Sequence, residues 1–164
     1  MAATVYSGAD GTISVAVEST PAGTEAKTVV DKYSLTPIGR ATGVTIRVTN
    51  EVKPFHELGQ RFATDLRPGN INVYGTIDRA YINGALLRLM LGSAADSRPA
   101  GTFLGPSFNL SLQLRNPAQP DVTAGVTVMG VQIEEWNYSV PEDDFVLEQV
   151  SFRALWIKTE ETGG

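Results

Sequence analysis

The segment that most constrains the fold of this chain is Tyr74–Gly92, YGTIDRAYINGALLRLMLG, where a strand pattern runs directly into a short apolar block closed by glycine. Around its start, Val73 and Ile77 fall on one side of an extended chain, whereas Asn72 and Thr76 fall on the other. The alternation predicts a strand with one buried face and one wet face.

The apolar block that follows predicts a short helix over about residues 83–91. Ala85–Leu91 contains strong helix formers and no β-branched residue, Asn83 can cap the first turn, and Gly92 can end the last one. The alternative is a hairpin, because Asn-Gly is also the commonest two-residue turn. We favour the helix.

This helix would be only about 12 Å long at about 1.5 Å per residue, and a helix of that length does not persist alone in water. It must therefore dock on a sheet or on a neighbouring subunit. The side chains expected to make that contact are Leu86, Leu87 and Met90.

Several other segments have strand patterns. Apolar and polar residues alternate in Gly43–Thr49 and in Phe108–Arg115, and Met129-Gly130 interrupts the alternation after Val126, which predicts a β-bulge or bend. Phe145–Lys158 is predicted to be a final long strand, apolar on both sides near Leu155, Trp156 and Ile157 as if both faces were covered, after a turn at Pro141–Asp144. Six or seven strands are completed by Thr12–Val17 and Thr28–Leu35, and Ser19–Thr28 is expected to be a flexible hairpin or linker.

Three long connections lack a strand or helix pattern: Asn50–Pro68, Ser93–Pro106 and Asn116–Thr123. Loops of such length are uncommon in compact domains unless they have a function. The first carries four large apolar side chains, which either pack over the sheet of the same subunit or contact another subunit: Phe55, Leu58, Phe62 and Leu66.

The composition bounds the class of protein. A length of 164 residues suits one domain, 1–164, with flexible termini, and the absence of cysteine excludes disulfides and thiolate chemistry. The first twelve residues, MAATVYSGADGT, predict no secretion signal, and no apolar run predicts a membrane span. A net charge of −5 argues against a surface that grips duplex DNA.

No residue pattern indicates an enzyme, a cofactor site or a metal site. His56 is the single histidine, so it cannot form a two-histidine site within one chain. Glu134 and Glu135 are adjacent and point to opposite faces of a strand, so they do not form a catalytic carboxylate pair. Trp136, Tyr138 and Trp156 could offer a stacking platform for a sugar or base, although aromatic side chains in β proteins more often belong to cores and interfaces.

Two regions resemble the tail tube proteins of bacteriophages, particularly those of contractile tails. The first is the strand with its apolar turn, GTIDRAYINGALLRLMLG, preceded by LRPGNINVYG; the second is the closing run WNYSVPEDDFVLEQVSFRALWI. The resemblance implies a mainly β fold, a β-sandwich or open barrel of two packed antiparallel sheets with one short flanking helix. Wide, water-filled barrels suit strands with one apolar and one polar face.

The resemblance also implies a function as a structural virion protein. Six copies would form a ring, and rings would stack into a hollow tube inside the tail sheath, between a baseplate or initiator and a tail terminator. DNA would pass without specific binding, and assembly would occur in the host cytoplasm. Asn50–Pro68 matches the loop that reaches adjacent subunits or rings, and candidates for the lumen wall are Asp78, Glu134 and Glu148.

Two alternatives remain open at this point. The same architecture serves as the inner tube of bacterial contractile injection systems, which carry effectors rather than a genome. A different class is a carbohydrate-binding or adhesin-like β-sandwich module that uses Trp136 and Trp156.

Overall fold

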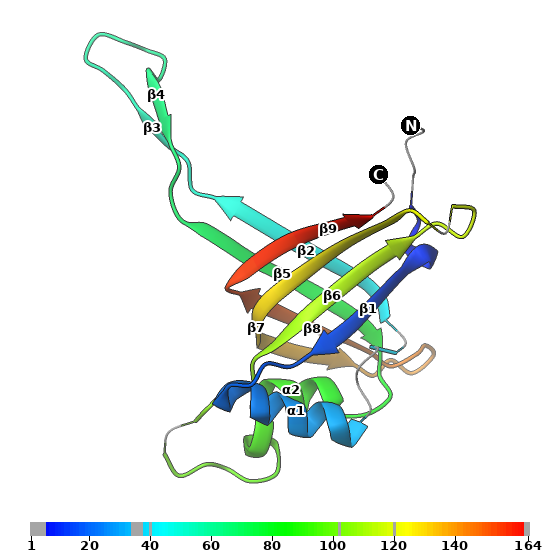
Figure 1. Cartoon of the computed structure of the whole chain (residues 1–164). Helices are drawn as coiled ribbons and strands as arrows, with labels where there is room; N and C mark the ends of the chain where they lie inside the picture. Colours follow the sequence, from blue (N-terminus) through cyan, green and yellow to red (C-terminus); the bar gives the residue numbers. More distant parts are fainter. Residues whose placement is uncertain (1–5, 34–37, 40, 102, 120, 163–164) are drawn as a thin grey trace.

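The computed structural model describes residues 6–33, 38–39, 41–101, 103–119 and 121–162. Strands dominate this part of the chain (Figure 1). In chain order the elements are the 3-10 helix η1 (Gly8–Asp10), β1 (Gly11–Ala16), α1 (Pro21–Tyr33), β2 (Ala41–Asn50), β3 (Lys53–Phe55), β4 (Asp65–Arg67), β5 (Ile71–Ala80), α2 (Ala85–Leu91), the 3-10 helix η2 (Gly92–Ala95), β6 (Phe108–Arg115), β7 (Thr123–Ser139), β8 (Leu147–Ala154) and β9 (Trp156–Thr162).

Seven strands form one curled antiparallel sheet in the order β1-β6-β7-β8-β5-β2, with β9 also paired to β7, and β3 and β4 pair separately. Strand β7 is shared between two layers. Its first half pairs with β6 and β9, and residues from Gln132 onward pair with β8. We call β1-β6-β7-β9 layer A and β7-β8-β5-β2 layer B. The expected sandwich or open barrel of antiparallel strands is confirmed.

The bend that lets β7 serve both layers lies at Gly130. This residue has a φ of 67°, a left-handed conformation that favours glycine. Its N–H donates to Asn109 Oδ1 at 3.1 Å, and a Cβ built on it would lie 2.7 Å from Leu155 Cδ1. The bend predicted at Met129-Gly130 is therefore confirmed, and Leu155 fills the space that a side chain would need.

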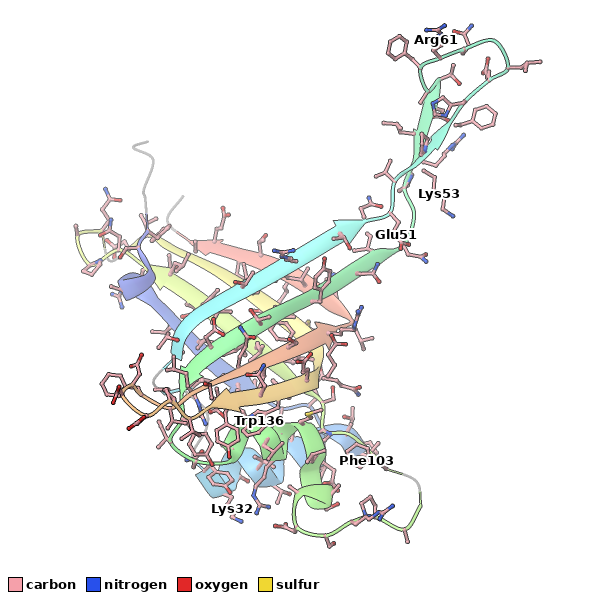
Figure 2. The ribbon with its side chains drawn as sticks, turned by 180° about the vertical axis from the view of Figure 1, so that it is seen from behind. Lys32, Glu51, Lys53, Arg61, Phe103 and Trp136 are labelled. Carbon is pink, nitrogen blue, oxygen red and sulfur yellow. The ribbon has the colours of Figure 1, made fainter. Side chains whose placement is uncertain are left out.

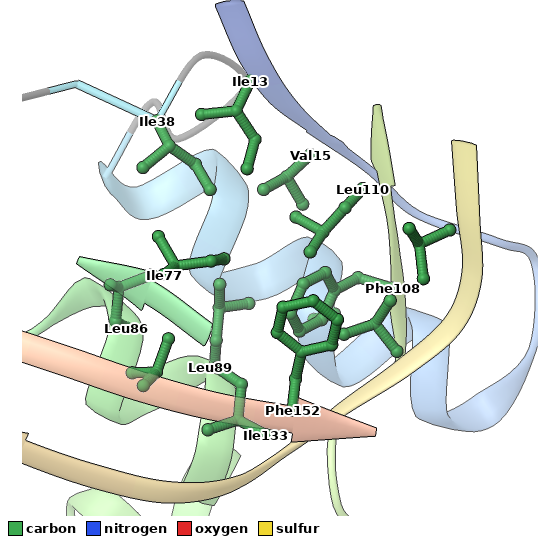
Figure 3. Packing of buried hydrophobic residues seen from close by; sticks show 14 of the residues in the cluster. Ile13, Val15, Ile38, Ile77, Leu86, Leu89, Phe108, Leu110, Ile133 and Phe152 are labelled. Atoms are coloured by element: carbon green, nitrogen blue, oxygen red, sulfur yellow. The ribbon is translucent and has the colours of Figure 1, made fainter. Parts of the chain in front are cut away.

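The core lies between the two layers and is closed at one end by the helices (Figure 1). Helix α2 packs on β7, and α1 packs on α2. Figure 3 shows side chains from both layers and from α2 converging, among them Ile13, Ile77, Leu86, Leu89, Phe108, Leu110 and Phe152. Ala26, Val29 and Val30 of α1 belong to the same cluster. Burying apolar side chains of this size contributes about 1.5 to 3 kcal/mol each, so this cluster is the main source of stability.

Helix α2 confirms the prediction for residues 83–91 and excludes the Asn-Gly hairpin. The N–H of Ala85 donates to Asn83 Oδ1 at 3.1 Å, so Asn83 orders the first turn from one position before Gly84, the N-cap residue. Gly92, with a φ of 59°, ends the helix. Within the described residues, no helix is long and apolar enough to cross a membrane.

Helix α1 corrects two predictions, because Thr28–Leu35 was expected to be a strand and Ser19–Thr28 a flexible segment. The helix begins at Pro21, a favoured first position, and the hydroxyl of Thr20 accepts a hydrogen bond from the Gly23 N–H at 3.0 Å. Its buried face contains Ala26, Val29 and Val30 at helical spacing. The β-branched valines obscured that spacing, and residues 34–35 lie outside the described residues.

The C-terminal prediction is also corrected. Phe145–Lys158 is not one strand, because β8 ends at Ala154 and β9 begins at Trp156. Leu155 is 87% exposed and Trp156 is 58% exposed, so the prediction that both faces are covered there is wrong for the subunit by itself. Where a turn was predicted at Pro141–Asp144, residues 142–144 form a bend before β8.

Candidate assembly surfaces

The connection between β2 and β5 forms an arm, residues 51–69, that projects away from layer B (Figures 1 and 2). Strands β3 and β4 pair along it. At its base the N–H of Glu51 donates to the Asn70 carbonyl oxygen at 2.9 Å, and nearer its tip the Thr64 N–H donates to the Phe55 carbonyl oxygen at 2.9 Å. Gly59, with a φ of 84°, lies in the turn. The arm is therefore an ordered hairpin.

The arm buries none of its large apolar side chains against the subunit. Every side chain from Glu51 to Pro68 is exposed. The exposed fractions are 57% for Phe55, 105% for Leu58, 88% for Phe62 and 63% for Leu66. Of the two interpretations of this segment, packing over the sheet of the same subunit is excluded. Exposed apolar side chains gathered on one projection are typical of a surface that contacts another protein.

The face of layer B that points away from the core is polar. The register aligns Thr45, Thr76, Ser151 and Glu135 in one row across the four strands, and Arg47, Tyr74, Arg153 and Gln132 in the next. Charges of both signs lie on this face, and Arg153 Nε is 2.8 Å from Glu134 Oε2. The pattern is that of a sheet with one dry and one wet face.

Two of the three predicted lumen residues lie on this wet face. Asp78 accepts a hydrogen bond from Gln149 Nε2 at 2.7 Å, and Glu134 pairs with Arg153. The third, Glu148, is a correction: its side chain is fully buried, so it does not face a water-filled lumen. In the register of β8 it lies on the same face as the buried Val150 and Phe152.

Glu148 instead forms a buried ion pair with Arg79, which the sequence analysis missed. Arg79 Nε lies 2.6 Å from Glu148 Oε1, and the Trp136 indole N–H donates to Glu148 Oε2 at 2.9 Å. The Arg79 Nη2 group also donates to the Asn83 carbonyl oxygen at 3.3 Å, next to the start of α2. The signal was present: Arg79 shares the phase of Ile77, so the alternation places it on the buried face.

The side chains that were predicted to pack the short helix are buried to different extents. Leu86 is fully buried, whereas Leu87 and Met90 are half-buried, with Met90 packed against the core. Leu89, which the sequence analysis did not single out, is fully buried. The helix therefore docks on its own subunit through Ala85, Leu86 and Leu89.

Layer B has two open edges among the described strands. Strand β2 pairs with β5 alone, and residues 132–139 of β7 pair with β8 alone. Open edges invite pairing with another chain, and natural proteins usually cover, shorten or close them. Strand directions alternate across the layer, so β7 and β5 run one way and β8 and β2 the other.

Candidates for chemistry are sparse in the part of the chain that the structure describes. No group of three or more histidine, cysteine or acidic side chains gathers there as a metal site would require. His56 lies exposed on the arm. A cavity of about 480 Å³ beside η2 is lined by Leu91, Phe103 and Asp96 among others. Next to this cavity, the hydrogen bond from Arg88 to Asp96 raises the pKa of the Arg88 guanidinium.

The architecture matches that of known solved structures. No protein-family model and no curated protein sequence matches the chain. Among solved structures, the SPP1 tail tube aligns with a TM-score of 0.61 at 13% identity, over 98% of this chain and 80% of that one. This chain has the tail-tube fold.

Two other structures share the tail-tube fold at low sequence identity. A chain of the sheath-tube complex of the extracellular contractile injection system PVC, in the extended state, aligns with a TM-score of 0.64 at 10% identity, over 95% of this chain and 91% of that one. A chain of the anti-feeding prophage (AFP) baseplate aligns with a TM-score of 0.62 at 14% identity, over 98% and 97%. The fold that the sequence resemblance implies is confirmed.

Proposed function

We propose that this protein is the subunit of a phage tail tube, a structural virion protein with no catalytic role. The observation that carries the proposal is the pair of open edges on layer B. A copy rotated about an axis beside the sheet would place its β7 next to β2 of the first copy. Because these strands run in opposite directions, they would continue the antiparallel ladder. Such a head-to-tail contact closes into a ring when the rotation allows it.

In this ring the wet face of layer B would line the lumen. Barrels of about 16 to 18 strands are already wide enough to leave an aqueous channel. Six copies, the number implied by the family resemblance, would contribute more strands than that. Asp78 and Glu134 remain the proposed lumen residues, together with Arg47 and Arg153. Since Glu134 pairs with Arg153, cationic groups on this wall are partly neutralised, which suits a channel that passes DNA without binding its phosphates.

The arm is the proposed contact between rings. It is an ordered hairpin, so little conformational entropy is lost when it docks, and Phe55, Leu58, Phe62 and Leu66 would be buried in the stack. The stacked tube would lie inside a sheath, between a baseplate or initiator and a terminator, in the virion tail assembled in the host cytoplasm. The shared fold and the resemblance support these proposed partners.

Electron microscopy of the purified protein tests the function. We expect rings or tubes with a central channel, at high protein concentration or after addition of short tube fragments as seeds. Sedimentation of the same samples measures the assembled fraction. A species that stays monomeric at high concentration and with seeds contradicts the proposal.

The arm can be tested separately from the ring. Leu58→Asp is expected to leave the fold and the ring intact but to prevent stacking, because burying an unpaired carboxylate costs several kcal/mol. Gln60→Asp is the matched control, since it adds the same charge at an exposed polar position on the same arm. Stacked tubes of normal length from Leu58→Asp would remove the arm from the assembly interface.

The inner tube of a contractile injection system is the second candidate, favoured by the shared fold with chains of the PVC and AFP assemblies. The two functions differ in cargo rather than in the ring. Particles purified from producing cells decide between them: a tail attached to a DNA-filled head supports the phage tube, and headless particles with protein cargo support the injection system. We do not propose a carbohydrate-binding role, because Trp136 donates its indole N–H to the buried Glu148, and Trp156 lies beyond the Gly130 bend in layer A.

A further inference from the structure

An aromatic cluster lies on the core-side face of layer B at its β7 edge. We use this name for Tyr81, Trp136 and Tyr138. The rings of Tyr81 and Tyr138 stack with centroids 5.5 Å apart, and those of Trp136 and Tyr138 are 4.7 Å apart. Tyr81 is 39% exposed and Tyr138 is 49% exposed, while the Trp136 indole is fixed by its hydrogen bond to Glu148. The cluster is therefore a preorganised but incompletely covered contact surface.

At the opposite edge of layer B, an apolar cavity of about 220 Å³ opens between β1 and β2. These two strands end the curled sheet and do not pair with each other. We call this cavity the seam. Its lining is small or apolar, and includes Gly11, Ile13, Ala41, Val44, Leu112 and Leu114.

The cluster and the seam lie at the same level of layer B. Trp136 pairs with Val150, Val150 with Ile77, and Ile77 with Val44. In the next row on the same face, Tyr138 pairs with Glu148, Glu148 with Arg79, and Arg79 with Ala41. Both features also lie on the core-side face of the layer. A stagger of two residues between copies would keep these faces together, because side chains alternate with a period of two.

We propose that, in the ring, the aromatic cluster of one copy inserts into the seam of the next. This inference rests on the proposed ring and names its lateral contact. Insertion would cover Tyr81 and Tyr138 and would fill a cavity that each subunit leaves open by itself. Aromatic side chains that fill pockets supply much of the binding energy of interfaces.

Cysteine cross-linking tests the contact directly, because the chain has no cysteine of its own. Tyr138→Cys is combined with Ala41→Cys or with Val44→Cys, and assembled protein is oxidised and run on a non-reducing gel. Within one copy these positions are three strand spacings apart, about 14 Å, which is too far for a disulfide. A ladder of cross-linked oligomers from either pair is the expected result.

The control pairs Tyr138→Cys with Lys158→Cys, which lies on β9 in layer A and should give no ladder. In addition, Tyr138→Ser should raise the protein concentration needed for half-assembly at least tenfold, whereas Tyr74→Ser, on the opposite face of the layer, should not. Rings seen by microscopy without a ladder from either cysteine pair overturn the seam contact and leave the ring standing. Absence of rings from the unmodified protein overturns both proposals.

Discussion

Glu148→Leu is expected to lower the free energy of unfolding by about 3 to 5 kcal/mol, because it leaves the Arg79 guanidinium buried without its counter-ion. Arg79 is 2% exposed, and Glu148 also accepts the Trp136 indole hydrogen bond. The substitution removes both the ion pair with Arg79 and the hydrogen bond from Trp136. Urea unfolding followed by circular dichroism measures the loss.

Two further variants test the cause of that loss. Glu134→Leu breaks the exposed pair with Arg153 and should change the free energy of unfolding by no more than about 1 kcal/mol. The double variant Arg79→Met/Glu148→Leu removes both buried charges and should recover most of the lost stability. A loss below 1 kcal/mol in Glu148→Leu alone would show that the buried pair contributes little.

Gly75→Ala is expected to lower the free energy of unfolding by about 3 kcal/mol, at the upper end of the typical cost of overpacking. Gly75 lies between Ile46 of β2 and Phe152 of β8. A Cβ there would lie 2.1 Å from the Thr45 carbonyl oxygen and 2.8 Å from Phe152 Cζ. Because the first of these atoms belongs to the backbone, β2 must move away from β5 to make room.

Hydrogen exchange locates the damage from Gly75→Ala, since the amides of β2 should lose protection before those of β8. The same variant should weaken ring formation, because β2 is the edge strand that is proposed to pair with β7 of the next copy. Gly101→Ala is the control: a Cβ at Gly101 meets no atom within 4 Å, and its stability should match that of the unmodified protein. Unchanged β2 protection in Gly75→Ala would contradict this account.

Local patterns predicted most of the strands and one helix. Phe108–Arg115 and Gly43–Thr49 alternate cleanly, and β6 and β2 include those residues. Ala85–Leu91 lacks β-branched residues, so its helical propensity and its tertiary environment agree. In α1 the local propensity and the tertiary environment disagree. Val29 and Val30 favour strands, and only their burial beside Ala26 reveals the helix.

The candidate surfaces were only partly predictable, because they depend on which strands become neighbours. Alternation places Arg79 on a buried face, but it does not state that Glu148, on another strand, will meet it. The arm was recognisable as a long loop with four large apolar side chains. Their exposure required coordinates, since the chain by itself does not reveal whether a sheet face is available to cover them.

Strand β7 has a mechanical consequence. Since one continuous strand belongs to both layers, the layers cannot slide past each other unless backbone hydrogen bonds break on one side of Gly130. In a sandwich whose two sheets share no strand, the sheets meet face to face at a plane of side-chain contacts, and such sliding costs only packing. A tube wall built from this subunit would lack that plane at every β7, so twist applied to its outer surface would reach the channel lining without slip.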